Sequence, residues 1–86
     1  MAIKIFIDQG HNPQNPNAGA EAFGLREQDI NYEVGILLAD MLNANPNFEA
    51  RTSRTYPEEQ LGTSTTTSLQ TRVTMANSWG ADYFIS

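Results

Sequence analysis

His11, the only histidine of the chain, is the residue whose type and position most favour chemistry. It belongs to the run Asp8-Gln9-Gly10-His11-Asn12, which follows an apolar segment. Imidazole suits two tasks, the ligation of a metal ion and general-base catalysis. A single histidine in a loop more often has neither task. Taken alone, His11 therefore leaves three interpretations open: a metal ligand, a general base or a loop residue.

Two carboxylates could act together with His11. Glu27 lies at the expected start of a helix, where it could point at the imidazole, although acids at helix starts are also favoured simply by the helix dipole. Asp8 could hold the second ring nitrogen of His11, or it could only organise the turn. Glu21, Asp29 and Glu33 are expected to be exposed polar residues.

The other candidates favour structural roles. Arg54 and Arg72 are expected to bind carboxylates or loop carbonyls rather than to clamp a substrate. Trp79 and Tyr83 are expected to pack in the core or at an edge, with sugar stacking as the alternative. The sequence has no P-loop, dinucleotide-binding fingerprint, EF-hand loop or G-x-S-x-G nucleophile motif.

The elements that must position these residues begin with an Ile-rich strand at residues 2–8. Ile3, Ile5 and Ile7 share one face and Phe6 lies on the other, as in a parallel strand that is buried on both sides. Residues 12–24 contain two Asn-Pro pairs and are expected to form a loop.

A helix is predicted over residues 26–44. Gly35 weakens its middle, and the segment around Pro46 ends it. The spacing of its apolar residues predicts one buried stripe: Ile30, Val34, Leu37, Leu38, Met41 and Leu42.

The second half of the chain repeats this alternation. Residues 48–53 favour a strand and residues 57–67 a polar connection. Ser68 is expected to cap a second helix that ends at Gly80, and residues 81–86 form another apolar strand. The apolar stripe of this second helix is predicted to be Leu69, Val73 and Ala76.

This order predicts a parallel β-α-β-α-β segment of the α/β class with right-handed crossovers. Functional sites of such sheets lie beyond the carboxyl ends of the strands, which is where His11 occurs. Residues 81–86 resemble the buried middle of a sheet, so we expect residues 1–86 to be a single incomplete domain.

Composition excludes several classes of protein. The 86 residues are 40% hydrophobic and 17% charged, which is typical of a globular domain. The net charge of −5 argues against binding to nucleic acid or to an acidic membrane surface. The absence of cysteine excludes disulfides and cysteine-ligated zinc. No signal peptide or membrane-spanning run is recognisable.

Taken in order, these motifs resemble the start of the zinc-dependent N-acetylmuramoyl-L-alanine amidase catalytic domain of autolysins, sporulation amidases and phage endolysins. The family's Asp-x-Gly-His after the first strand is similar to IFIDQGH at residues 5–11. Its Glu at a helix start is matched in GLREQDINYEV at residues 24–34. The remaining matches are Ser53-Arg54, then Leu69, Arg72, Ala76 and Asn77, and finally ADYFIS at residues 81–86.

The resemblance implies that His11 and Glu27 are zinc ligands and that the fold is the N-terminal half of a larger six-stranded amidase-type sheet. It implies hydrolysis of the bond between N-acetylmuramic acid and L-alanine in bacterial peptidoglycan, outside the cell or in its wall. The family's third ligand and general base would lie beyond Ser86, so no catalytic residue is expected within this chain, and the fragment is expected to be inactive alone.

A different class of function also remains open. The chain could be a non-catalytic α/β module that retains half of the fold for binding or assembly. In either case, an exposed sheet edge is expected to make the isolated fragment unstable or prone to self-association, with weak zinc binding or none.

Overall fold

A three-stranded parallel sheet lies at the centre of the structure, a computed structural model that describes residues 2–86. The order is β4-β1-β5, with β1 (Ile3–Ile7) between β4 (Phe48–Thr52) and β5 (Tyr83–Ile85). Both neighbours run parallel to β1, with Ile5 opposite Ala50 on one side and opposite Tyr83 on the other. The predicted parallel α/β segment is therefore confirmed.

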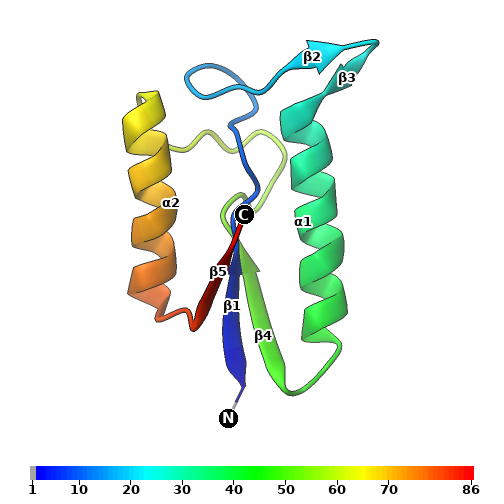
Figure 1. The fold of residues 1–86 in the computed structure, drawn as a ribbon, viewed down its shortest axis with the longest axis vertical. Coiled ribbons are helices and arrows are strands. Elements are labelled where there is room, and N and C mark those ends of the chain that lie inside the picture. The colour runs from blue at the N-terminus through cyan, green and yellow to red at the C-terminus, as the bar shows by residue number, and fades with distance from the viewer. Residues whose placement is uncertain (1) are drawn as a thin grey trace.

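Two helices connect the strands. Helix α1 (Glu27–Asn43) joins β1 to β4, and helix α2 (Thr65–Trp79) joins β4 to β5. Figure 1 shows α1 on one side of the sheet and α2 on the other. The chain moves from β1 to one neighbour and then crosses back to the other, and such a reversal opens a crevice at the carboxyl ends of the strands.

The core on the α1 side is small. Its buried members are Ile5, Ile7, Ala39 and Ala50, against which Leu38, Leu42 and Phe48 pack. Most of the predicted stripe on α1 is exposed, so that expectation was wrong for Ile30, Val34, Leu37 and Met41. The reason is that α1 turns Gln28, Gly35 and Ala39 inward, and these residues lie one above another on the helix.

Helix α2 shows the same difference from expectation. Ala76 is buried as predicted, but Leu69 and Val73 are about half exposed, because the inward face also carries Ser68 and Arg72. This inward face of α2 is partly polar, and it contacts the polar loop that follows β1.

Strand β5 is the exposed sheet edge that the sequence predicted for this segment. All three of its residues are exposed, since β5 lies at an edge of the described sheet and pairs only with β1. Its one aromatic contact is Phe84 stacked on Phe6, with ring centroids 5.7 Å apart. The apolar strand expected within residues 81–86 is confirmed at Tyr83–Ile85.

The N-terminus of α2 lies before the predicted cap. Ser64, not Ser68, is the N-cap: its hydroxyl accepts the Thr67 N–H, and the Thr67 hydroxyl accepts the Ser64 N–H in return. Ser68 lies inside the first turn, buried, where it accepts a hydrogen bond from Asn17 Nδ2 at 3.2 Å. The predicted end at Gly80 is confirmed, with a left-handed φ of 78°.

A small antiparallel hairpin interrupts the segment expected to be loop. Strands β2 (Glu21–Ala22) and β3 (Leu25–Arg26) pair across a turn at Phe23 and Gly24, both of which have positive φ. The hairpin leads directly into α1 and therefore sets where that helix begins. No helix among residues 2–86 has the length and apolar character needed to cross a membrane.

Candidate metal centre

His11 and Glu27 meet at the carboxyl edge of the sheet, as the sequence predicted. His11 Nε2 lies 2.9 Å from Glu27 Oε1, and the two side chains are 35% and 50% exposed. The histidine follows β1 and the glutamate begins α1, so separate elements bring the two donors together. Their role as zinc ligands stays a prediction.

The position of Glu27 depends on the segment before the hairpin. The Glu27 N–H donates to the Ala20 carbonyl at 2.9 Å, and the Ala20 N–H reaches Glu27 Oε1 at 3.4 Å. Gly19 makes this approach possible, because a Cβ at that position would lie 2.8 Å from both Cβ and Oε1 of Glu27. A side chain at residue 19 would thus push the carboxylate away from His11.

Asp8 does not hold the second nitrogen of His11, so that interpretation was wrong. Its Oδ1 instead accepts a hydrogen bond from Arg72 Nη1 at 2.7 Å. The Arg72 guanidinium is buried and its positive charge attracts the carboxylate more strongly than a neutral imidazole would. His11 Nδ1 is left buried with no hydrogen-bond partner among the described residues.

Arg54 is the second buried arginine of this region. It donates to the Gln28 carbonyl at 2.7 Å and to the Pro57 carbonyl at 2.6 Å, and it lies 5.1 Å from the Tyr32 ring. Burial, followed by the nearby charge of Arg72, lowers the pKa of Arg54 below its usual value. The expectation that both arginines bind carboxylates or loop carbonyls is confirmed.

Three buried polar residues lie beside His11 and were not predicted from the sequence. The Gln9 side chain accepts the Arg54 N–H at 2.8 Å, and Ser53 Oγ accepts the Gln9 N–H at 3.0 Å. The Asn12 amide bonds to both the N–H and the carbonyl of Leu61. One available signal was Gly35 in the middle of α1, where a Cβ would lie 2.3 Å from Gln9 Cγ.

The aromatic candidates lie away from this centre. Trp79 is half-buried at the end of α2, with the Arg51 guanidinium 4.7 Å and the Lys4 ammonium 5.6 Å from its ring. This is the edge packing that the sequence favoured. Tyr83 is mostly exposed on β5.

The donor atoms fit a zinc ion in part. Imidazole nitrogen and carboxylate oxygen are ordinary zinc ligands, and two donors of one tetrahedral ion are roughly 3.3 Å apart at the usual bond lengths. The 2.9 Å between His11 and Glu27 is close to that separation, and both side chains are open to solvent. No cluster of three or more His, Cys, Asp or Glu residues occurs in the described part of the chain, so these two donors make an incomplete set.

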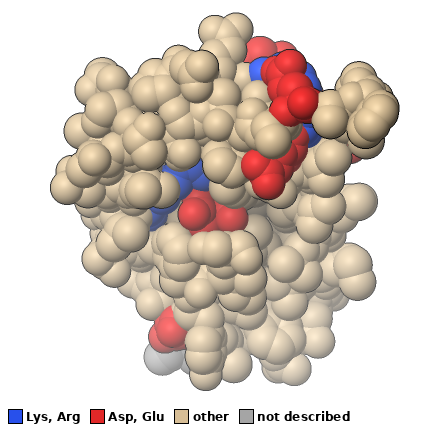
Figure 2. Space-filling model, turned by 45° about the horizontal axis from the view of Figure 1, so that its top comes forward, with Lys and Arg blue, Asp and Glu red and all other residues tan. Residues whose placement is uncertain are grey.

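Charged side chains and a cavity lie at the same edge of the sheet as the two donors. In Figure 2, which turns the carboxyl edge of the sheet toward the viewer, acidic side chains lie exposed beside basic ones that are mostly covered. A cavity of about 200 Å³ lies between α1 and the end of β5, with Gly10, Asn31, Gly35, Ile85 and Ser86 in its lining. It occupies the crevice that the strand order predicts.

Comparison with known proteins connects this geometry to a family. A family model described as N-acetylmuramoyl-L-alanine amidase matches residues 5–86. The chain is 41% identical over 85 residues to N-acetylmuramoyl-L-alanine amidase CwlM of Bacillus licheniformis. It is 35% identical over 85 residues to the sporulation-specific N-acetylmuramoyl-L-alanine amidase of Bacillus subtilis strain 168.

Each alignment covers 98% of this chain, and the chain spans about 30% of the length of each relative. The family match includes both His11 and Glu27 and nearly every residue that holds them in place. We conclude that this chain belongs to the N-acetylmuramoyl-L-alanine amidase family.

Proposed function

We propose that the full-length protein is a zinc-dependent amidase that cleaves the bond between N-acetylmuramic acid and L-alanine in bacterial peptidoglycan. One observation carries the proposal: His11 and Glu27 converge at the carboxyl edge of the sheet in a chain whose residues 5–86 match this family. Because peptidoglycan lies outside the cytoplasmic membrane, the proposed place of action is the cell wall or the extracellular space.

His11 and Glu27 would hold the zinc ion with one nitrogen and one carboxylate oxygen. A zinc ion bound there would polarise the amide carbonyl and make a bound water more acidic. Glu27 adds a negative charge that offsets the charge of the ion, and its contact with Ala20 keeps the carboxylate aimed at His11. The half-exposed position of both side chains leaves room for a substrate carbonyl to approach.

This assignment gives residues 1–86 only part of the machinery. A catalytic zinc site normally has three protein ligands and an open position, and hydrolysis needs a general base. The described residues supply two clustered donors, and we assign no general base among them. We therefore propose that residues 1–86 expressed alone do not hydrolyse peptidoglycan.

The test measures zinc content and clearing of purified cell walls with the full-length protein. His11→Ala and Glu27→Gln are expected to lower both readouts by at least about tenfold, since each removes one ligand. Glu33→Gln is the matched control, because Glu33 is an exposed carboxylate on the same helix and should leave both unchanged.

Two results would contradict the proposal. If His11→Ala retained full zinc content and full activity, the ligand assignment would be wrong. If the unaltered full-length protein bound no zinc and cleared no walls, the non-catalytic module would be the better interpretation.

A further inference from the structure

His11 has a backbone conformation that other contacts must hold. Its φ is 71°, in the left-handed region that residues other than glycine seldom adopt. Such conformations persist only where surrounding contacts determine them. The direction of the imidazole depends on this φ, because rotation of the main chain at His11 would carry the ring away from Glu27.

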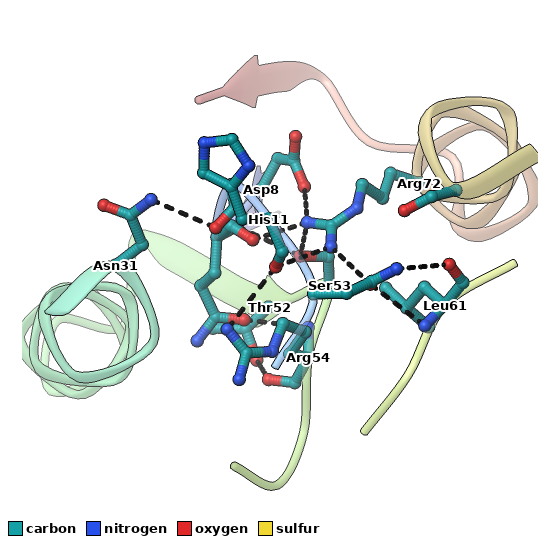
Figure 3. A network of polar contacts seen from close by, with 12 residues as sticks. Asp8, His11, Asn31, Thr52, Ser53, Arg54, Leu61 and Arg72 are labelled. Carbon is teal, nitrogen blue, oxygen red and sulfur yellow. Dashed lines mark hydrogen bonds and ion pairs between the residues drawn. The ribbon is translucent and has the colours of Figure 1, made fainter. Parts of the chain in front are cut away.

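Four of the hydrogen bonds that hold this segment come from the Arg72 side chain, which reaches across from α2 (Figure 3). Its Nη2 donates to the His11 carbonyl at 2.9 Å and to Asn12 Oδ1 at 3.0 Å. Its Nη1 donates to Asp8 Oδ1 at 2.7 Å and to the Gln9 carbonyl. One planar guanidinium thus binds the chain on both sides of His11.

The guanidinium is well suited to this task. Arg72 is 1% exposed, so its hydrogen bonds do not compete with bulk water. The fork of donors in arginine is rigid and spreads over two terminal nitrogens, whereas the single ammonium nitrogen of lysine could not reach the acceptors of both nitrogens at once. Figure 3 also shows the His11 ring on the side away from the Arg54 guanidinium, and its Nε2 lies 2.9 Å from Glu27 Oε1 at the start of α1.

Arg54 provides an internal comparison. It is as deeply buried as Arg72, but its short hydrogen bonds go to the carbonyls of Gln28 and Pro57. Its distance to the His11 carbonyl is 3.5 Å, at the limit of a hydrogen bond. Arg54 therefore joins α1 to the segment after β4, while nearly all partners of Arg72 lie within residues 8–12.

From this difference we propose that Arg72 is a positioning residue of the zinc site: it fixes the main chain at His11 so that the imidazole faces Glu27. The inference rests on the proposed function, because it assumes that His11 binds zinc. Arg72 lies on α2 and touches neither donor side chain, yet under this proposal it controls the affinity of the site for zinc.

The experiment measures the zinc dissociation constant of the full-length protein by competition with a chelating dye. The variants are Arg72→Met, Arg72→Lys and Arg54→Met, compared at a temperature where circular dichroism shows each to be folded. We expect Arg72→Met to weaken zinc binding by about 10- to 100-fold, as the loss of partners around metal ligands commonly does. The zinc dissociation constant of Arg72→Lys should lie between those of the unaltered protein and Arg72→Met. Arg54→Met should change this constant less than threefold.

A second readout does not depend on affinity. Cobalt substituted for zinc reports ligand geometry through its visible absorption, and Arg72→Lys, the variant more conservative in charge and length, should alter that spectrum while Arg54→Met leaves it unchanged. If zinc affinity and the cobalt spectrum followed only the stability of each variant, Arg72 would be a general structural residue and the inference would fail. If the unaltered protein bound no zinc, the proposed function itself would fail.

Discussion

The carboxyl edge of the sheet and the outer faces of the two helices are built in opposite ways. At the edge, Arg72 and Arg54 are buried and bind carbonyls and side chains from several segments of the chain. On the outer faces, Leu37, Met41 and Val73 are exposed, with no cover among residues 2–86. This edge of the sheet is therefore held together mainly by directed hydrogen bonds, and apolar packing contributes less to its geometry.

The largest effect is expected when a buried arginine is removed from the edge. Arg54→Met would leave the Gln28 and Pro57 carbonyls without their donor, and we expect the free energy of unfolding to fall by about 2–4 kcal/mol. Denaturant unfolding of the full-length protein measures this change. The control is Arg51→Met on the exposed surface, and equal losses in the two variants would remove the contrast between the two regions.

A smaller loss is expected at Gly35. An exposed helical glycine gains stability on change to alanine, by about 1 kcal/mol. Here the new Cβ would lie 2.3 Å from Gln9 Cγ, so Gly35→Ala should instead cost about 1–3 kcal/mol. The cost should shrink in a Gln9→Ala background, because the clashing atoms are then gone. A stabilised Gly35→Ala protein would show that Gln9 moves freely and that the edge is less rigid than described.

The N-cap of α2 makes a smaller contribution to stability at the same edge of the sheet. Ser64→Ala removes the hydroxyl that accepts the Thr67 N–H, and we expect a loss of about 1 kcal/mol. Ser78→Ala, at an exposed position of the same helix, should change stability by less than about 0.5 kcal/mol. Thermal melts of the two variants decide this point, and a larger loss at Ser78 would contradict the assignment of the cap.

The smallest effect on folding, and a separate effect on association, is expected on the outer face of α1. Patches of exposed apolar side chains favour association. We propose that residues 1–86 expressed alone self-associate, and that Leu37→Lys combined with Met41→Lys shifts their elution in gel filtration toward the monomer. Gln70→Lys combined with Thr74→Lys on α2 adds the same two charges at exposed positions outside the apolar face of α1 and serves as the control. A single monomeric peak for the unaltered chain would refute the proposal.

Local patterns predicted the elements well because each element depends on neighbouring residues. The Ile-rich run specified β1, and the acids followed by apolar periodicity specified α1 to within one residue of each end. The convergence of His11 and Glu27 followed from the resemblance and from the rule for parallel sheets, since both residues adjoin the carboxyl end of β1.

The wrong predictions share one cause. Hydrophobic periodicity shows which residues lie on the same face of a helix, but it does not show which part of the molecule packs against that face. Leu37 and Met41 have the spacing of core residues, yet α1 turns Gly35 inward to accommodate Gln9. The contact between Asp8 and Arg72 joins residues 64 positions apart, and no local pattern specifies such a pair. Ser64 and Ser68 have the same chemistry, and only the packing of the first turn distinguishes the cap from the buried residue.

The central place of β1 in the sheet has a consequence for the order in which the protein acquires its structure. Ile3 pairs with Phe48 and Ile5 with Tyr83, so β1 is synthesised before both of its partner strands and must wait for them. Ribosomes deliver chains from the N-terminus at a finite pace, and pairings between distant residues form slowly. His11 thus emerges from the ribosome long before Arg72, which holds its main chain, and the loop of the candidate site stays unorganised in the nascent chain until α2 has followed.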